Sequence, residues 1–171
     1  MATELGLPLV TVIATPGAAL SRDAEERGMA GEISRCLAEL VTLRAPTVAV
    51  LLGQGTGGGA LALVPADRVL AAQHAWLAPL PPEGASAIVH RTVSRAAEMA
   101  QQQGVRSLDL RQSGVVDVIV PECEDAADEA VAFCIRVSDY LRSELAKLHL
   151  TEAAGRTRRR AERYRQLGRP G

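Results

Sequence analysis

Hydrophobic residues in the first half of the chain alternate between strand-like and helix-like patterns. Residues 7–15 (LPLVTVIAT) form a nearly continuous, β-branched run that is typical of a strand covered on both faces. From residue 23 to 44 apolar residues recur at helical spacing, and Asp23 with Glu26 three positions later forms a capping box. A second buried strand is expected at residues 47–52. The pattern predicts a strand, helix, strand unit with a right-handed crossover.

The second half of the chain predicts shorter segments and then two long helices. Short strands are expected at residues 68–72 and 75–80, and Pro81-Pro82 precedes a helix that begins near Glu83. The remaining expected elements are helices near 94–103 and 108–113, a strand at 115–120, and helices at 125–149 and 151–166. This mixture of strands and helices predicts an α/β fold.

The two C-terminal helices have different hydrophobic patterns. The helix at 125–149 carries an apolar stripe that needs a partner surface, made of Ala127, Val131, Cys134, Ile135, Ser138, Leu141, Leu145 and Leu148. The helix at 151–166 has arginines on most sides and few apolar positions. A packing face for this last helix is therefore hard to find within the chain itself.

Length and composition indicate one globular domain. The chain has 171 residues, of which 47% are hydrophobic and 23% charged, and chains this short rarely divide further. Aromatic residues make up 2%, so the core must be packed from Ala, Val, Leu and Ile. A net charge of −1 argues against bulk attraction to nucleic acid or anionic membranes. Residues 151–171 hold seven Arg and two Glu, a net charge of +5, but a single aromatic, Tyr164, which is too little to indicate RNA or DNA binding.

The cysteine pattern indicates neither a metal site nor a disulfide framework. Cys36, Cys123 and Cys134 form no CxxC pair and have no His at ligand spacing. The sequence has no uncharged stretch of 18 residues and no signal-peptide pattern, so a membrane span and secretion lack support. We therefore expect a cytoplasmic protein that binds no metal.

A glycine-rich segment, GQGTGGGALAL at residues 53–63, separates the second buried strand from an Ala/Leu run that can start a helix. Glycines let a ligand approach the backbone, and free N–H groups at a helix N-terminus carry partial positive charge. Such a bend can bind a phosphate or a developing oxyanion. No Lys-Ser or Lys-Thr follows Gly59, which excludes a Walker loop, and no suitably placed acidic residue supports dinucleotide binding. A tight turn needed only for helix–sheet packing remains an alternative.

Five short segments occur in a specific order along the chain. They are TPGA at 15–18, AEERG at 24–28, GQGTGGGALA at 53–62, DRV at 67–69 and PEGASAI at 82–88. Together they resemble the α-type carboxyltransferase subunit of acetyl-CoA carboxylase, and RYRQL at 163–167 resembles that family's C-terminal helix. The resemblance covers essentially the whole chain but only the later part of the family's subunit. We therefore expect this chain to be a piece of something longer.

The resemblance implies a crotonase-like (ClpP/crotonase) ββα-superhelix core with C-terminal helices, without the N-terminal part of that fold. We expect the core at residues 1–123 and a helical extension of the same domain at 124–171. The implied activity is that of the carboxybiotin-binding half of an acyl-CoA carboxyltransferase, with acetyl-CoA as the expected acceptor and malonyl-CoA, for fatty acid biosynthesis, as the product. The implied partners are an acyl-CoA-binding half, a biotinylated carrier protein and a CoA thioester, in an oligomeric assembly.

In that family, main-chain N–H groups after the glycine bend stabilise negative charge on the ureido oxygen of biotin. By the match to GGALA, the donors here are Gly59 and Ala60, and no side-chain acid is required because biotin itself takes the acyl-CoA proton. Glu83 and Ser86 begin the next helix and are candidates for the biotin cleft, although ordinary helix capping explains them equally well. The implied cofactor-binding residues are Gly57, Gly58, Gly59, Ala60, Glu83, Gly84 and Ser86.

The chain departs from the family pattern at several loop positions. The family's Asp before Thr-Pro-Gly is Ala14, and its Glu in the glycine segment is Gln54. Two alternatives therefore stay open. One is a γ-like subunit of a biotin-independent malonate decarboxylase, or another crotonase-superfamily enzyme acting on CoA thioesters. The other is a non-catalytic assembly module. For the arginines of 151–171, contact with an acidic partner surface or with CoA phosphates is favoured.

Overall fold

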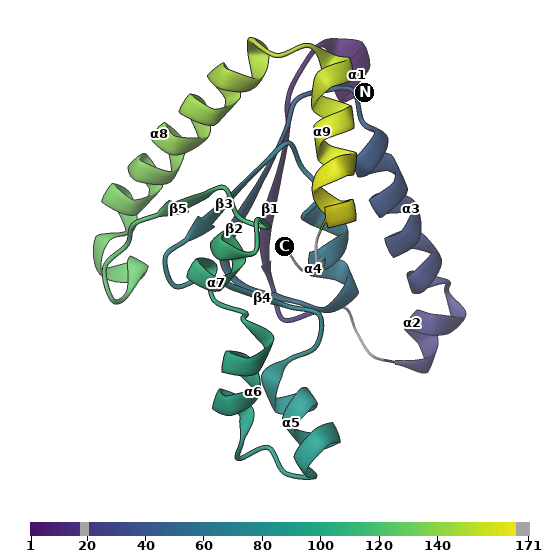
Figure 1. The fold of residues 1–171 in the computed structure, drawn as a ribbon, viewed down its shortest axis with the longest axis vertical. Helices are drawn as coiled ribbons and strands as arrows, with labels where there is room; N and C mark the ends of the chain where they lie inside the picture. Colours follow the sequence, from purple (N-terminus) through teal and green to yellow (C-terminus); the bar gives the residue numbers. More distant parts are fainter. Residues whose placement is uncertain (18–20, 167–171) are drawn as a thin grey trace.

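A parallel sheet forms the centre of the computed structural model, which describes residues 1–17 and 21–166 (Figure 1). Ala18 and Leu167, which belong to two of the matched segments, lie outside these residues. The sheet has the order β1 (Leu9–Thr15), β2 (Thr47–Thr56), β3 (Arg68–Ala72) and β5 (Val118–Val120). A further strand, β4 (Trp76–Ala78), pairs with the carboxyl end of β2, so β3 and β4 follow one another along the same edge of β2.

Helices cover both faces of this sheet. Figure 1 shows α3, α4 and α9 on one side and α8 on the other, which confirms the predicted α/β class. The helices are α1 (Ala2–Leu5), α2 (Arg22–Glu26), α3 (Met29–Thr42), α4 (Gly57–Leu63), α5 (Pro82–His90), α6 (Ala96–Gln103), α7 (Ser107–Gln112), α8 (Ala130–His149), preceded by a 3-10 turn at Ala126–Glu129, and α9 (Ala153–Gln166). None of those in the described ranges combines enough length with enough apolar character to cross a membrane.

The core consists of small and medium aliphatic side chains, as the composition predicts. Val48 and Ala49 of β2 and Leu70 and Ala71 of β3 have no solvent exposure, and the cluster around them is otherwise Ala, Val, Leu and Ile, apart from Phe133. Because β2 is buried on both faces, five of its residues in succession, 47–51, are shielded from solvent. A fully buried aliphatic side chain contributes about 1.5–3 kcal/mol, so β2 is the element on which the sheet depends.

The helix predicted over residues 23–44 is in fact two helices. The break falls at Gly28, whose φ of 79° lies in the left-handed region that a residue with a side chain rarely adopts. Asp23 is not the cap: the N-cap is Ser21, whose hydroxyl accepts the N–H of Ala24 at 3.2 Å. The apolar spacing was correct for α3, but the glycine allows the chain to turn between the acidic first helix and the apolar second one.

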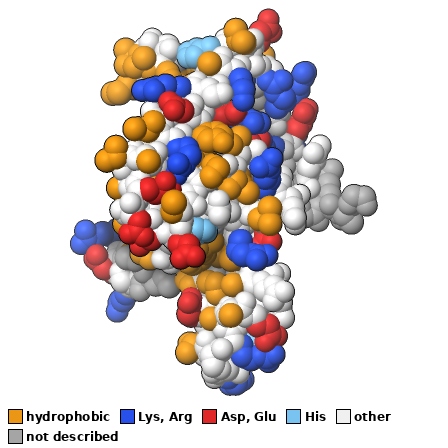
Figure 2. All heavy atoms as spheres, turned by 90° about the vertical axis from the view of Figure 1, so that its left-hand side faces the viewer, with side chains coloured by type: hydrophobic (Ala, Val, Ile, Leu, Met, Phe, Trp, Pro, Cys, Tyr) orange, Lys and Arg blue, Asp and Glu red, His pale blue; other side chains and the backbone are white. Residues whose placement is uncertain are grey.

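The apolar stripe predicted for the helix at 125–149 is correct only in its second half, where Leu145 and Leu148 pack against the core. Val131 and Ile135 are 76% and 58% exposed, whereas Phe133 and Leu148 are buried against the sheet. Figure 2 shows this side of the molecule, where hydrophobic side chains are scattered among charged ones. In the first half of the helix Phe133 takes the core-facing position that the predicted stripe gave to Val131 and Ile135, and Glu144, which the stripe left out, is also buried (2% exposed).

The α5–α6 hairpin projects from the body of the molecule (Figures 1 and 2). Its two helices contact mainly each other, and Arg91, at the turn after α5, has a left-handed φ of 56°. Three apolar residues on it, Ile88, Val89 and Val93, are 72%, 61% and 62% exposed. The hairpin therefore carries apolar surface that the described chain does not cover.

Helix α9 packs on the molecule through arginines, which corrects the expectation that it has no packing face in this chain. Arg160 is buried with a side chain 0% exposed, and it donates to Asp67 at 2.7 Å and to the carbonyl of Leu43 at 3.0 Å. Arg156 is 8% exposed and donates to the carbonyl of Arg44 at 3.0 Å. Both α8 and α9 thus lie against the sheet, and the domain boundary at residues 123 and 124 stays a prediction.

Glu144 should make stability depend on pH. Burial raises the pKa of its carboxyl, but hydrogen bonds from Lys147 (2.6 Å) and Arg68 (2.5 Å) outweigh burial and hold this pKa below its ordinary value. The folded state therefore binds fewer protons than the unfolded state. The stabilisation that the ionised Glu144 side chain contributes is present above the ordinary glutamate pKa of about 4.3. It is lost as the pH falls through the lower pKa that this carboxyl has in the folded state.

We expect the free energy of unfolding of Glu144→Gln to fall less steeply between about pH 5 and about pH 3 than that of the native chain. Urea titrations across this range measure the difference. Glu32→Gln, which removes a carboxylate that is 65% exposed and paired with Arg35, is the control and should retain the native slope. Equal slopes for Glu144→Gln and the native chain would contradict the assignment.

Candidate functional site

The glycine segment forms a bend where β2 ends and α4 begins. The chain leaves β2 at Thr56 and turns at Gly57, whose φ of 68° is left-handed. Gly57, Gly58 and Gly59 are half-buried, so they are reachable from solvent without being fully exposed. The sequence therefore predicted correctly that this segment joins a buried strand to a helix.

The main-chain amides of this bend point out of the helix end. The first N–H groups of a helix have no partner inside it, and the N-cap Thr56 makes no side-chain capping hydrogen bond. In the described ranges, none of the backbone hydrogen bonds of turns, loops and caps uses the amide of Gly57, Gly58 or Gly59. These amides therefore form a local array of donors with partial positive charge.

Ala60 is placed differently from the three glycines before it. It is the fourth helical residue and 0% exposed. The N–H at this position ordinarily bonds to the carbonyl of the N-cap residue, here Thr56. Of the two donors implied by the resemblance, Gly59 is consequently better placed than Ala60 to bind a ligand.

The loop after β1 lies against the bend. A Cβ placed on Gly17 would come within 3.3 Å of the carbonyl oxygen of Thr56, and one placed on Gly57 would lie 4.0 Å from the Cα of Gly17. Gly17 also has a left-handed φ of 118°, and its N–H donates to the Thr15 hydroxyl at 3.2 Å. Gly17 was not among the site residues expected from the sequence, although it belongs to the TPGA segment at 15–18, which is one of the matched motifs.

Packing fixes the other side of the bend. A Cβ on Gly58 would lie 3.1 Å from Cδ1 of Ile33, so α3 presses closely on the start of α4. Gln54, where the family has Glu, donates to the Thr56 hydroxyl at 3.2 Å and thus supports the last residue of β2. The bend therefore holds its amides in place through backbone constraints rather than charged side chains.

The predicted residues of α5 divide into two groups. Strand β4 pairs Ala78 with Thr56, so α5, which follows four residues later, starts at the same end of the sheet as the bend. Glu83 is exposed and Gly84 is half-buried, and both remain accessible. Ser86, in contrast, is fully buried and donates its hydroxyl to the carbonyl of Thr92 at 2.5 Å. Its side chain serves the α5–α6 hairpin and does not face a cleft.

An apolar cleft of about 620 Å³ lies at the base of the hairpin and was not anticipated. Trp76 of β4 lies partly exposed in its wall, with Ala100 and Val105. Glu83 and Arg106 add charge to the same cleft. The only sequence signal for it was the single Trp of the chain, Trp76, within the short strand expected at residues 75–80.

This arrangement can stabilise negative charge on a ligand oxygen. Preorganised N–H donors at a helix N-terminus need no reorganisation when charge develops on an oxygen next to them. The three residues of the bend have no Cβ, so a ligand oxygen such as the ureido oxygen of biotin can approach the main chain closely. The acceptor oxygen would be held by the main chain of Gly58 and Gly59.

Comparison with known proteins agrees with this geometry. Residues 1–168 match the family described as acetyl co-enzyme A carboxylase carboxyltransferase-like. The chain is 59% identical over 170 residues to the probable biotin-dependent acyl-coenzyme A carboxylase beta3 subunit of Mycobacterium tuberculosis, covering 99% of this chain and 34% of the relative. It is 38% identical to the acetyl-coenzyme A carboxylase carboxyl transferase subunit alpha of Rubrobacter xylanophilus, covering 98% and 53%.

The fold agrees with a solved structure as well. The hetero-dimer of Pseudomonas malonate decarboxylase superposes with a TM-score of 0.73 at 19% identity, over 94% of this chain and 65% of that chain. This likeness supports the crotonase-like fold predicted from the sequence. The chain spans about a third to a half of the two curated relatives above. The family match nevertheless extends over residues 1–168 of this chain. The chain therefore belongs to the acetyl-CoA carboxylase carboxyltransferase-like family of biotin-dependent acyl-CoA carboxyltransferases.

Proposed function

We propose that this chain forms the carboxybiotin-facing half of an acyl-CoA carboxyltransferase, with acetyl-CoA as its expected acceptor and malonyl-CoA as the product. The observation that carries the proposal is the bend at 57–59, where a member of this family presents main-chain amides without a cap or loop partner. Carboxybiotin, when bound, supplies the carboxyl group. The amides of Gly58 and Gly59 hold its ureido oxygen while negative charge develops there.

The contribution of each amide can be bounded. Removing one donor of this kind from an enzyme typically lowers the rate about 100- to 1000-fold. Glu83 and Gly84 start α5 at the same end of the sheet as the bend and are candidates to contact the bound biotin, whereas Ser86 contributes by fixing the hairpin. The chain therefore supplies binding, orientation and charge stabilisation, without a general base of its own.

A partner half is needed for the complete reaction. The relatives are about two to three times longer than the region that they share with this chain, which leaves room for an acyl-CoA-binding part. The exposed apolar residues of the hairpin, Ile88, Val89 and Val93, are suited to contact such a partner. We place the active site at the interface between the two halves, in an oligomer that a biotinylated carrier protein visits.

Mixing experiments test this function directly. The chain alone is expected to show no exchange of the carboxyl group between malonyl-CoA and biotin. Addition of an acyl-CoA-binding carboxyltransferase half and a biotinylated carrier should restore it, as followed by the appearance of acetyl-CoA. Formation of acetyl-CoA that proceeds equally well without biotin, with release of the carboxyl group as CO₂, would assign the chain to the malonate decarboxylase type instead.

A non-catalytic assembly role remains the second candidate because of Ala14. The acidic residue that the family has at this position is missing next to the Thr15–Gly17 loop, which contacts the bend. If the mixture assembles into a stable complex, judged by size-exclusion chromatography, and still shows no exchange, the assembly role is correct. Replacing Ala14 by Asp should then raise activity.

A further inference from the structure

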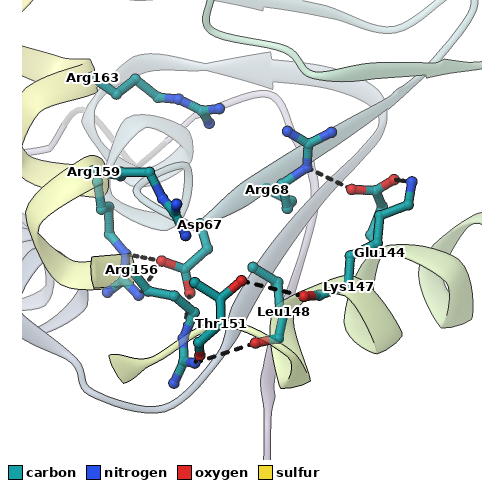
Figure 3. Close-up of a pocket in the computed structure, with 10 residues that line it drawn as sticks. Asp67, Arg68, Glu144, Lys147, Leu148, Thr151, Arg156, Arg159 and Arg163 are labelled. Carbon is teal, nitrogen blue, oxygen red and sulfur yellow. Dashed lines mark hydrogen bonds and ion pairs between the residues drawn. The ribbon is translucent and has the colours of Figure 1, made fainter. Parts of the chain in front are cut away.

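A cavity of about 420 Å³ lies between α8 and α9, at the amino ends of β3 and β5 (Figure 3). Six cationic side chains line it against two carboxylates, Asp67 and Glu144; the cations are Arg68, Lys147, Arg156, Arg159, Arg160 and Arg163. Parallel strands place this cavity at the end of the sheet opposite to the glycine bend. It is therefore separate from the carboxyl-transfer site proposed above.

Part of this charge has a structural use. Arg160 pairs with Asp67 at 2.7 Å, and Arg68 and Lys147 share the carboxylate of Glu144 at 2.5 and 2.6 Å. Asp117 accepts from Arg68 at 2.8 Å and also from Arg163. These contacts stabilise the packing of α8 and α9 on the sheet, and they engage every carboxylate near the cavity.

Other donors are left over. Arg159 makes no hydrogen bond or ion pair with the described part of the chain. Two buried guanidinium nitrogens have no hydrogen-bond partner among residues 1–17 and 21–166: Nε of Arg156, a side chain only 8% exposed, and Nη1 of Arg163. The nearest carboxylate oxygen to Arg156 Nε, on Asp67, is 3.8 Å away, which is an ion pair but too long for a hydrogen bond. Figure 3 shows Arg159 and Arg163, from α9, extending toward the same space as Arg68, from β3.

We propose that this cavity binds a phosphate group. A phosphate dianion accepts several hydrogen bonds at once and matches the forked donors of guanidinium groups. It would pair with Arg159 and neutralise the surplus of positive charge that the carboxylates of Asp67 and Glu144 leave on the lining of the cavity. A water molecule occupies about 30 Å³ in the liquid, so the cavity has room for a phosphate together with several bridging waters.

Calorimetry with inorganic phosphate tests the proposal on the 171-residue chain, with potassium chloride at matched ionic strength as the blank. We expect one phosphate per chain. Arg159→Ala should weaken its affinity at least tenfold, because the loss of one charge-assisted contact costs about that much. The matched control is Arg158→Ala, whose side chain is 77% exposed, pairs with Glu162 and does not line the cavity. It should bind phosphate as the native chain does.

Two further titrations identify the source of the phosphate. If CoA displaces phosphate and 3′-dephospho-CoA does not, the site takes a phosphate carried by CoA. If neither displaces it, the site takes free phosphate. The proposal is overturned if the native chain binds no phosphate at about 10 mM, or if Arg158→Ala and Arg159→Ala weaken binding equally.

Discussion

Replacing Gly59 by Asp is expected to lower biotin-dependent carboxyl exchange at least about 100-fold in the reconstituted enzyme. Gly59 is the last of the three glycines before the helix turns inward at the buried Ala60. An aspartate there adds a side chain to the bend and places a negative charge where the proposed mechanism develops one. The added side chain hinders the approach of the ureido oxygen to the main-chain amides, and its negative charge repels the charge that develops on that oxygen. Both effects lower the rate.

The measurement is the initial rate of acetyl-CoA formation from malonyl-CoA and biotinylated carrier. Gly31→Asp is the matched control: Gly31 lies on an exposed part of α3, and a Cβ there meets nothing within 4 Å. It adds the same charge and should leave the rate within about twofold. Unfolding curves should show that both variants fold. A folded Gly59→Asp protein with native activity would remove these amides from the mechanism.

Replacing Asp67 by Asn is expected to destabilise the fold by about 3–5 kcal/mol, the usual cost of removing one partner from a buried ion pair. The Asp67 carboxylate is 3% exposed and accepts from Arg160 at 2.7 Å and from the amide of Thr47 at 2.9 Å. Without its charge, Arg160 and Arg156 stay buried with no carboxylate beside them. Because domains of this size are stable by only about 5–15 kcal/mol, much of the total would be lost.

Urea unfolding followed by circular dichroism measures this loss. Asp23→Asn provides the control, since Asp23 is 72% exposed and pairs with Arg27 at 3.0 Å on the surface. Its free energy of unfolding should stay within about 0.5 kcal/mol of the native value. Similar small losses in both variants would mean that the contact between α9 and β3 adds little to stability.

The sheet and the glycine bend were predictable from the sequence because local patterns determine them. Continuous apolar runs located β1 and β2, but only β2 is covered on both faces, because β1 is an edge strand whose Val12 is 57% exposed. The glycines between a strand and an Ala/Leu run likewise located the start of α4. The resemblance then supplied the chemistry that these residues support, which their spacing alone had left open between an anion site and a tight turn.

Tertiary contacts decided what the sequence could not. A glutamate normally faces solvent. Glu144 faces the core because its carboxylate pairs there with Arg68, which lies 76 residues earlier in the sequence. The arginines of α9 seemed exposed because their partner Asp67 lies 93 residues before Arg160. Ser86 resembled a ligand-binding residue, but a carbonyl six residues later uses its hydroxyl. The sequence did hold one sign of these ion pairs, an Asp directly before each of two strands: Asp67 before β3 and Asp117 before β5.

The contact between Asp67 and the last helix affects the order in which the molecule can form. During synthesis, the strands from β1 to β5 leave the ribosome well before residues 156–160 do. Until then the carboxylate of Asp67 lacks Arg156 and Arg160 and has to remain hydrated, which keeps the amino edge of the sheet open. Closing so long a loop is slow. The nascent chain therefore reaches its final packing only when its C-terminal arginines have been synthesised. A chain that ended before them would lack these ion pairs at the amino edge of its sheet.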